Sequence, residues 1–404
     1  MTASPGSSNA NELNTRRSWI WALCGVYFFA LAGVLVSTYL PRYFESIGIS
    51  TAAIGVMYSA RSLSQSAMNL SWATLADRFG AIRRIIQLQY ALGLLALVCL
   101  PFTEIYPVIF AIIVIHGITA GCAVPLVDAL TLREVGSARF GTLRAWGSAG
   151  FGLMALCASA AGLWASHAEL AALAPWLMIA TGLATLASAS RFPAIDANID
   201  RPSARDALRL LSRPVLLLVF PICALHWASQ APYNLFIVFL CEQRGLGAWA
   251  PGLAVALGVF AEIVAFANGA RLLRAFRPYT LIVICVVVTA LRWYGTGVFA
   301  SAPAILALQL LHGLSFGAFF VAMMAILGHE IAPSVRATAQ ALLYFVVFGL
   351  GGALGNALSG LVLDHHGAAT LFRWAGWWEL GVFVIALAIL PYVQRIARPT
   401  SATP

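Results

Sequence analysis

The sequence contains no lysine and very little charge of either sign. All 24 basic residues of the 404-residue chain are arginine and only 15 residues are acidic, so charged side chains make up 10% of the chain. A soluble protein of this size carries about 25% charged residues. The hydrophobic fraction is 61%, and the mean hydropathy is +0.87. This composition excludes an ordinary soluble globular protein and predicts many membrane spans.

Motifs for metal binding, disulfides and catalysis are also missing. The seven Cys stand in or beside apolar runs and no two form a CxxC pair, so we expect free, buried thiols. The sequence has no HExxH or Walker motif, and its one GxSxG match, Gly313–Gly317, lies inside an apolar run rather than at a strand-to-helix turn. We therefore expect no enzyme, no cofactor and no metal site. A sensor usually has a separate soluble domain, and the tails are too short for one.

Twelve apolar runs are long enough to cross a bilayer, which takes about 20 residues. The predicted fold is an all-α polytopic membrane protein. We expect the spans at 18–40, 51–73, 85–102, 106–132, 140–164, 171–190, 214–240, 248–270, 279–299, 303–327, 337–362 and 371–393.

The arginines between the spans predict the orientation of the chain. Eighteen lie in loops on the side of the N-terminus, whereas Arg42, Arg244 and Arg373 lie in the opposite loops. Because arginine-rich loops stay on the cytoplasmic side, both termini are expected there, in a bacterial-type inner membrane without a cleaved signal peptide. The net charge of +9 therefore reflects membrane topology and lipid contact, and we expect no nucleic-acid partner.

A polar linker divides the chain into halves of six spans. The predicted organisation is a disordered tail (1–17), a first bundle (18–191), a cytoplasmic linker (192–213), a second bundle (214–394) and a short tail (395–404). Ile115–Gly121 (IHGITAG) in the fourth span is similar to Leu311–Gly317 (LHGLSFG) in the tenth, 196 residues later. The repeat supports two related bundles around a central path, in a chain expected to act as a monomer.

Two charged residues stand in long apolar runs on either side of a turn at Gly136. Asp128 lies eight residues before this glycine and Arg144 eight after it. In two helices that rise 1.5 Å per residue, both would sit roughly 12 Å from the turn, where they can meet. Ionisable groups at such a depth are costly and indicate a functional site. The alternative is a structural ion pair that locks two helices.

The loop between the second and third spans resembles the signature of the major facilitator superfamily. It reads Leu75–Arg84 (LADRFGAIRR), with Ala73 in place of the first signature glycine and Ala81 in place of the first basic residue. The resemblance implies a fold of two pseudo-symmetric six-helix bundles that alternate in access to the two sides. It also implies a gating role for Asp77, Arg78 and Gly80, with a solvated basic turn as the alternative.

A finer resemblance is to the phenylpropionate-permease group, which is related to lactose permease, an oligosaccharide–proton symporter. It rests on Pro125–Leu130, Phe140–Ser148, Gly258–Ile263, Arg292-Trp293 and Gln309–His312, in matching order. It implies substrate binding by Asp128, Arg144, Phe151, Arg292 and His312. Phe151 replaces the sugar-stacking tryptophan and Ser315 the usual proton-carrying glutamate. We therefore expect proton coupling at Glu262, Asp128 or His312, although His312 could also be a packing residue.

Further polar residues recur at helical spacing and are candidates for lining the cavity. Residues four apart share one helix face. The candidates are Arg61, Gln65 and Asn69 in the second span, His226, Gln230 and Asn234 in the seventh, and Gln340 and Tyr344 in the eleventh.

Together these features favour secondary active transport, with proton-coupled uptake of a small organic solute. The expected substrate is an aromatic acid, a sugar or a nucleoside-like compound, since two arginines, two acids and aromatic rings suit each of them. The alternative is proton-driven efflux of amphipathic compounds, which would need a wide apolar cavity.

Overall fold

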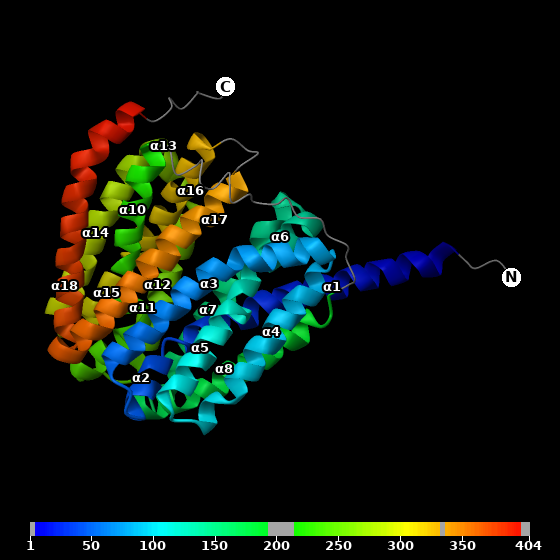
Figure 1. Cartoon of the computed structure of the whole chain (residues 1–404), viewed down its shortest axis with the longest axis horizontal. Coiled ribbons are helices and arrows are strands. Elements are labelled where there is room, and N and C mark those ends of the chain that lie inside the picture. The colour runs from blue at the N-terminus through cyan, green and yellow to red at the C-terminus, as the bar shows by residue number, and fades with distance from the viewer. Residues whose placement is uncertain (1–4, 193–213, 332–335, 397–404) are drawn as a thin grey trace.

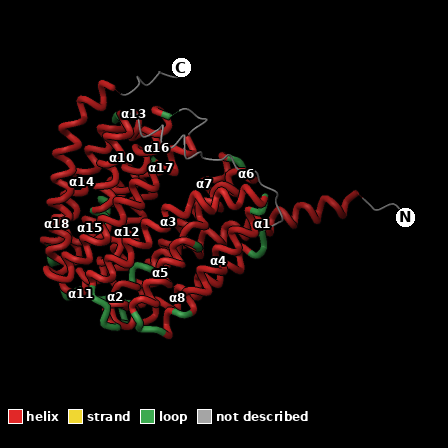
Figure 2. Tube along the Cα trace, viewed as in Figure 1, coloured by secondary structure: helices red, strands yellow, loops and turns green. Residues whose placement is uncertain are grey.

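The structure is a computed structural model that describes residues 5–192, 214–331 and 336–396. Over these residues the chain is helical, with short turns between the helices and no strand (Figures 1 and 2). The first half contains α1 (Pro5–Val36), α2 (Leu40–Ser46), α3 (Thr51–Phe79), α4 (Ile82–Val98), η1 (Leu100–Phe102), α5 (Tyr106–Ile118), η2 (Ala120–Cys122), α6 (Ala123–Val135), α7 (Ser137–Ala161) and α8 (His167–Ala189).

The second half contains the remaining helices. They are α10 (Pro214–Ala228), α11 (Ala231–Gln243), α12 (Trp249–Ala267), α13 (Gly269–Ala275), α14 (Pro278–Val298), α15 (Ala302–Gln309), η3 (Gly313–Ala318), α16 (Phe319–Glu330), α17 (Arg336–Tyr344), η5 (Phe345–Gly351) and α18 (Gly352–Ile396).

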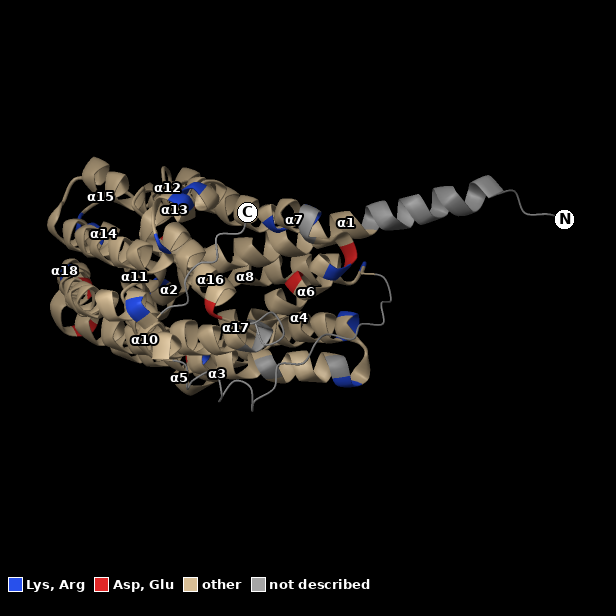
Figure 3. Ribbon diagram, turned by 90° about the horizontal axis from the view of Figure 1, so that it is seen from above, with Lys and Arg blue, Asp and Glu red and all other residues tan. Residues whose placement is uncertain are grey.

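The described helices fit the predicted all-α membrane fold. Nine stretches are long and apolar enough to cross a bilayer, and one of them, Ala339–Ile396, contains a sharp bend with a non-helical backbone at Gly367. This stretch is two spans in one. The helices α3 and α7 are also of spanning length, with 29 and 25 residues, but carry polar groups such as Arg61 and Arg144. All twelve predicted spans are therefore helical over most of their length. Charged residues are few in this apolar body (Figure 3).

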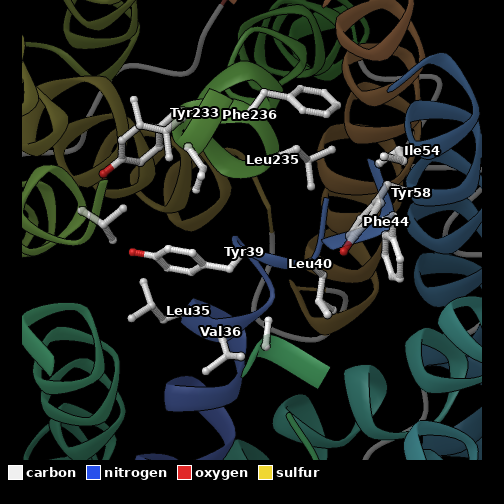
Figure 4. Close-up of a cluster of buried hydrophobic side chains, with 14 of the residues drawn as sticks. Leu35, Val36, Tyr39, Leu40, Phe44, Ile54, Tyr58, Tyr233, Leu235 and Phe236 are labelled. Atoms are coloured by element: carbon white, nitrogen blue, oxygen red, sulfur yellow. The ribbon is translucent and has the colours of Figure 1, made fainter. Parts of the chain in front are cut away.

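The two halves share a core at one end only. One cluster of buried apolar side chains draws on both halves, for example Tyr39 and Phe44 with Phe236 and Leu240. Figure 4 shows residues of α1 and α2 beside Leu235 and Phe236 of α11. A second cluster, around Val127, lies within the first half, and a third, around Phe319, within the second. The halves therefore meet at one end, which we call the closed end, and have separate cores at the other.

Polar contacts also join the halves at the closed end, which lies away from the two termini (Figure 1). Arg42 pairs with Glu242, with Nε–Oε2 at 2.7 Å. The backbone N–H and hydroxyl of Thr51 donate to Asp364 Oδ1 at 3.1 and 3.0 Å. Because this end is cross-linked by charge, hydrogen bonds and apolar packing, the space between the halves is sealed on this side.

Several spans are interrupted halfway. The fourth breaks at the short helix η2, and the tenth passes through a π-helical segment, η3. Both interruptions overlap the two copies of the predicted repeat, Ile115–Gly121 and Leu311–Gly317. The seventh span breaks between Ala228 and Ala231, next to Pro232, as expected of a proline that cannot donate to the helix. Such breaks free backbone groups inside a membrane, where only protein or a cavity can satisfy them.

Two local predictions need correction. The tail at 1–17 was expected to be disordered, but α1 is helical from Pro5 onward. Extending an existing helix costs far less than starting one, so the first span carries its helix into the polar tail. All seven Cys are free, but Cys99 and Cys157 are exposed rather than buried. The predicted linker at 192–213 lies, apart from Phe192, outside the described residues.

Candidate functional site

The α6–α7 hairpin brings Asp128 and Arg144 together, as predicted. Gly136 has a φ of +73°, a conformation that glycine adopts without steric cost, and it turns the chain from α6 into α7. Arg144 Nε lies 3.3 Å from Asp128 Oδ1, and the two side chains are 35% and 33% exposed. The pair is thus reachable by a solute, unlike a sealed structural ion pair.

Tyr27 of α1 completes this first cluster. Its hydroxyl lies 2.7 Å from Asp128 Oδ1 and 3.0 Å from the Thr131 hydroxyl, which itself donates to the Val127 carbonyl. The single hydroxyl hydrogen best serves the shorter contact, to the carboxylate. The Arg144 guanidinium carbon lies 5.4 Å from the Tyr27 ring centroid, close enough for a cation–π interaction. Tyr27 therefore orients both charged groups.

A second cluster centres on Arg292 of α14, which is fully buried. Its Nη1 lies 2.8 Å from His312 Nδ1 and 2.7 Å from Ser315 Oγ, and its Nη2 lies 2.8 Å from Gln309 Oε1. The guanidinium also stacks over Trp293 at 4.0 Å. Among the described residues no carboxylate lies within ion-pair distance of Arg292, so hydrogen bonds and ring contacts stabilise this buried charge.

The contact with Arg292 fixes the tautomer of His312. A guanidinium can only donate, so His312 Nδ1 accepts and Nε2 carries the hydrogen. His312 Nε2 lies 3.8 Å from Glu262 Oε2 on α12. Arg292, His312 and Glu262 thus form a row. The buried Arg292 cation polarises the neutral His312 imidazole, whose N–H side lies toward the Glu262 carboxylate. Glu262 is 20% exposed, so the row ends at the accessible space.

The two clusters lie on neighbouring helices of different halves. Arg144 is on α7 and Glu262 is on α12. The helices α7 and α12 also touch, because a side chain at Gly152 would meet Val259. Aromatic rings border the site: Phe316 stacks on His312 at 5.5 Å with planes 10° apart. Phe151 is half-buried and packs on the shared core.

Not every predicted lining residue faces this space. Arg61 packs on Gly117, and Gln65 donates to the Gly121 carbonyl at 2.8 Å. With His116 they line a small cavity of about 120 Å³ within the first half. Asn69 is half-buried, and its side-chain oxygen has no hydrogen-bond partner among the described residues.

The remaining candidates fall into three groups. Asn234 and Gln340 are exposed, and Gln340 donates to the Tyr344 hydroxyl at 3.1 Å. His226 and Gln230 are buried inside the second half. The predicted gating loop joins α3 to α4 through Gly80, whose φ of +58° confirms the tight turn. Arg78 is exposed there, and the side chain of Asp77 lies outside the described set.

Sequence reasoning missed a buried acid in the last span. Glu379 of α18 is fully buried and lies 3.0 Å, Oε1 to Nδ1, from His226, which is equally buried. The Ser229 hydroxyl donates to Glu379, and the Trp293 indole donates to Ser229 at 3.2 Å. The only sequence signal was the spacing of His226 and Ser229 on one helix face. Nothing in the sequence shows that Glu379, which comes 150 residues after Ser229, packs against this helix face.

An apolar cavity of about 560 Å³ lies apart from the Asp128 and Arg292 clusters and borders the Glu379 cluster only through Ser229. It is lined by Ser229, Pro232, Trp374, Trp377 and Trp378 among others, and contains none of the predicted site residues. Its surface is nearly devoid of polar groups, so it cannot orient a polar solute.

Comparisons with known proteins agree with this architecture. The chain is 28% identical over 198 residues to the putative nucleoside transporter YegT of Escherichia coli (strain K12), covering 45% of each chain. A 66-residue stretch is 41% identical to the MFS-type transporter pigP of Monascus ruber, covering 16% of this chain and 12% of that protein. The chain thus spans less than half the length of the curated relatives it matches.

Solved structures match over nearly the whole chain. The nucleoside transporter NupG superposes with a TM-score of 0.81 at 17% identity, covering 93% of this chain and 99% of NupG. A bacterial homolog of the human lysosomal transporter Spinster, solved in an inward-facing and unoccupied conformation, superposes with a TM-score of 0.72 at 13% identity, covering 96% and 99%. At these identities the likeness shows the fold.

The family model of the MFS_1 like family matches residues 20–374. The chain has two helical halves with a shared apolar core at one end, and it belongs to this family, which is a family of multi-pass membrane transporters.

Proposed function

We propose that this transporter imports nucleosides together with protons by alternating access. The observation that carries the proposal is the partly exposed Asp128–Arg144 pair of one half, whose helix α7 contacts α12, the helix of the other half that carries Glu262. Secondary transporters bind solutes where two such halves meet.

The charges of the site favour an uncharged, hydroxylated solute. Two carboxylates, Asp128 and Glu262, stand against two guanidiniums, Arg144 and Arg292, and His312 is neutral in this arrangement. The sum is close to zero, so an aromatic acid would enter with an unbalanced charge. A nucleoside offers ribose hydroxyls that can donate to Asp128 and accept from Arg144. Its base can lie against the rings at His312 and Phe316.

The names of two relatives support this substrate class. YegT is described as a putative nucleoside transporter and NupG as a nucleoside transporter. The resemblance to the phenylpropionate-permease group favours an aromatic acid instead, so the two classes are direct competitors at one site.

We further propose that Glu262 is the proton carrier of this site. It is one-fifth exposed, and its Oε2 lies 3.8 Å from His312 Nε2. Protonation would remove its negative charge and change the balance with Arg144. With both termini on the cytoplasmic side, as the arginine distribution favours, the closed end faces outward and the site opens inward.

Equilibrium binding tests this assignment. Uridine, adenosine and phenylpropionate are titrated into the purified transporter, and into Asp128→Asn and Arg144→Ala. We expect the nucleosides to bind and each variant to lose at least tenfold in affinity, because the partner is left without its charge-assisted bond. Glu134→Gln is the matched control, since Glu134 also lies on α6 but pairs with Arg133.

Two results would contradict this assignment. Binding of phenylpropionate but of neither nucleoside would replace the substrate class. Variants that lower the amount of folded protein, while the remainder binds normally, would make the Asp128–Arg144 pair a structural one.

A further inference from the structure

We propose that His226 and Glu379 form a second proton-binding site, separate from the solute site, which carries one proton through each transport cycle. This inference rests on the proposed proton-coupled transport and adds a site to it. The pair joins α10 to α18 inside the second half, and both side chains are 0% exposed.

Hydrogen-bond donors and acceptors fix the number of protons on this pair. His226 Nε2 lies 2.9 Å from the backbone carbonyl of Ser315. A carbonyl can only accept, so Nε2 carries a hydrogen. The other ring nitrogen, Nδ1, lies 3.0 Å from Glu379 Oε1, although the two atoms are not aligned for a hydrogen bond. A nitrogen lone pair and a carboxylate oxygen would repel each other at this distance, so one proton must lie on one of the two.

The surrounding groups cannot supply that proton. The Ser229 hydroxyl has one hydrogen and two acceptors in reach, Glu379 Oε1 and the His226 carbonyl, and it accepts from the Trp293 indole, so it has no further hydrogen to give the pair. Glu379 Oε2 has no hydrogen-bond partner among the described residues. Removing the proton in this conformation would leave a buried carboxylate without a cation beside it, which is strongly unfavourable.

Other ionisable groups around the pair are few. From α14, Cys285 lies close enough to Glu379 for their charges to interact, and Arg292 approaches through Ser315. From α10, Cys223 interacts with Cys285. The Phe319 ring of α16 covers the His226 ring, with centroids 4.2 Å apart. Among the described residues, Glu379 therefore forms an ion-pair contact only with His226.

Ser315 links this site to the solute site. Its carbonyl accepts from His226 and its hydroxyl oxygen accepts from Arg292, which also contacts His312. Ser315 belongs to the π-helical segment η3, where the backbone hydrogen bonds differ from those of an α-helix and a small rearrangement can move a carbonyl. Gain or loss of a proton at His226 would therefore shift η3. This shift would move the Arg292 guanidinium, which contacts His312 next to Glu262.

The proton is enclosed in this conformation and must exchange in another. A proton from water on one side of the membrane binds to the pair and is later released to water on the other side, with no other bond made or broken. For water to reach the pair when the closed end opens, either α10 must separate from α18 or water must enter the apolar cavity that Ser229 and Trp378 line.

Two proton sites predict a steep dependence of accumulation on the pH gradient. In proteoliposomes with the membrane potential held at zero, each proton that moves with the solute multiplies the limiting accumulation by about tenfold per pH unit. We expect the wild type to reach about a hundredfold accumulation of uridine for one pH unit. Glu379→Gln, which keeps an uncharged side chain of the same size, should reach about tenfold. Its exchange of labelled against unlabelled uridine should be unchanged.

The control is Glu330→Gln. Glu330 is also a buried acid of the second half and accepts from the Tyr279 hydroxyl at 2.8 Å, but it has no part in the proposed pair, so accumulation should equal that of the wild type. If Glu379→Gln does not reach the membrane, Glu379→Leu replaces it, because an apolar side chain of similar size can be buried without a partner but cannot hold a proton.

Two results would overturn the second site. One is equal accumulation by Glu379→Gln and the wild type. The other is loss of both accumulation and exchange in correctly inserted protein, which would make the pair structural. If the wild type transports no nucleoside, the proposed substrate fails, and infrared difference spectra of the purified transporter at two pH values still test the pair. Carboxyl or imidazole bands that disappear in Glu379→Gln support the site, and spectra unchanged by the substitution refute it.

Discussion

At the scale of single residues, Tyr27 determines how the exposed Asp128 and Arg144 side chains are held. It donates a 2.7 Å hydrogen bond to the carboxylate, and its ring lies under the guanidinium. Neither contact adds charge, so Tyr27 acts on the site by orientation. A site held by packing and hydrogen bonds loses less entropy when the solute binds.

Tyr27→Phe keeps the ring and removes only the hydroxyl. A hydrogen bond to a charged group contributes about 1.5–3 kcal/mol, so we expect nucleoside affinity to fall roughly tenfold in equilibrium binding. Tyr39→Phe is the matched control, because the Tyr39 hydroxyl is buried without a hydrogen-bond partner among the described residues. Equal affinities for Tyr27→Phe and the wild type would show that the Asp128 carboxylate needs no positioning.

Part of this site could be predicted from the sequence and part could not. Asp128 and Arg144 lie at equal distances in the sequence from Gly136, on the two arms of one helical hairpin. This symmetry predicts that the two side chains meet. Arg61 and Gln65 were correctly placed on one helix face, but the sequence does not show that this face turns toward Gly117 and Gly121. That orientation depends on how α3 is rotated in the bundle.

At the scale of helices, close approach at glycines seals the closed end. A Cβ atom at Gly252 of α12 would lie 2.6 Å from the Ala155 carbonyl oxygen and from the Ser159 nitrogen of α7. Both atoms belong to the backbone, so neither can rotate away. The packing of small residues across α7 and α12 is typical of helix contacts in membranes, and here the two helices come from different halves.

Gly252→Ala should therefore separate α7 from α12 at the closed end. We expect the population to shift toward a conformation open at this end, seen as a longer distance between spin labels on the two helices. Gly141→Ala is the control: Gly141 lies on α7, a Cβ there would meet no described atom within 4 Å, and alanine improves helix propensity equally at both positions. Unchanged distances in Gly252→Ala would mean that the helices absorb the methyl group without opening.

The breaks within helices were only partly predictable. Pro232 marks the break in the seventh span, because a proline cannot donate a helical hydrogen bond. The repeat at Ile115–Gly121 and Leu311–Gly317 identifies corresponding spans, but not that one forms a short 3-10 turn and the other a π-helical segment. These forms depend on the neighbouring helices, as does the pairing of Glu379 with His226.

At the scale of the whole molecule, the structure is asymmetric about its midplane. One apolar core joins the halves at the closed end, while each half has its own core at the other. The Arg42–Glu242 pair lies at the closed end and ties α2 to α11. Alternating access would require this core to open and the opposite end to close.

Glu242→Gln removes the one ion pair that joins the two halves over the described residues. The Glu242 side chain is 40% exposed, and exposed pairs contribute at most about 1 kcal/mol. We therefore expect at most a fivefold shift toward opening of the closed end, measured by spin-label distances between α2 and α11. Glu45→Gln is the control, since Glu45 pairs with the same Arg42 within one half. An equal shift in both variants would show that the charge of Arg42, and not its bridge to α11, controls closure.

Uptake into proteoliposomes tests the central claim most directly. The purified transporter is reconstituted, a pH gradient is imposed with the acidic side outside, and entry of labelled uridine is followed with and without a protonophore. We predict accumulation above the outside concentration, its collapse with the protonophore, and a weaker response to the gradient in Glu262→Gln. Uridine that only equilibrates, whatever the gradient, and a Glu262→Gln response identical to that of the wild type would contradict proton-coupled nucleoside uptake.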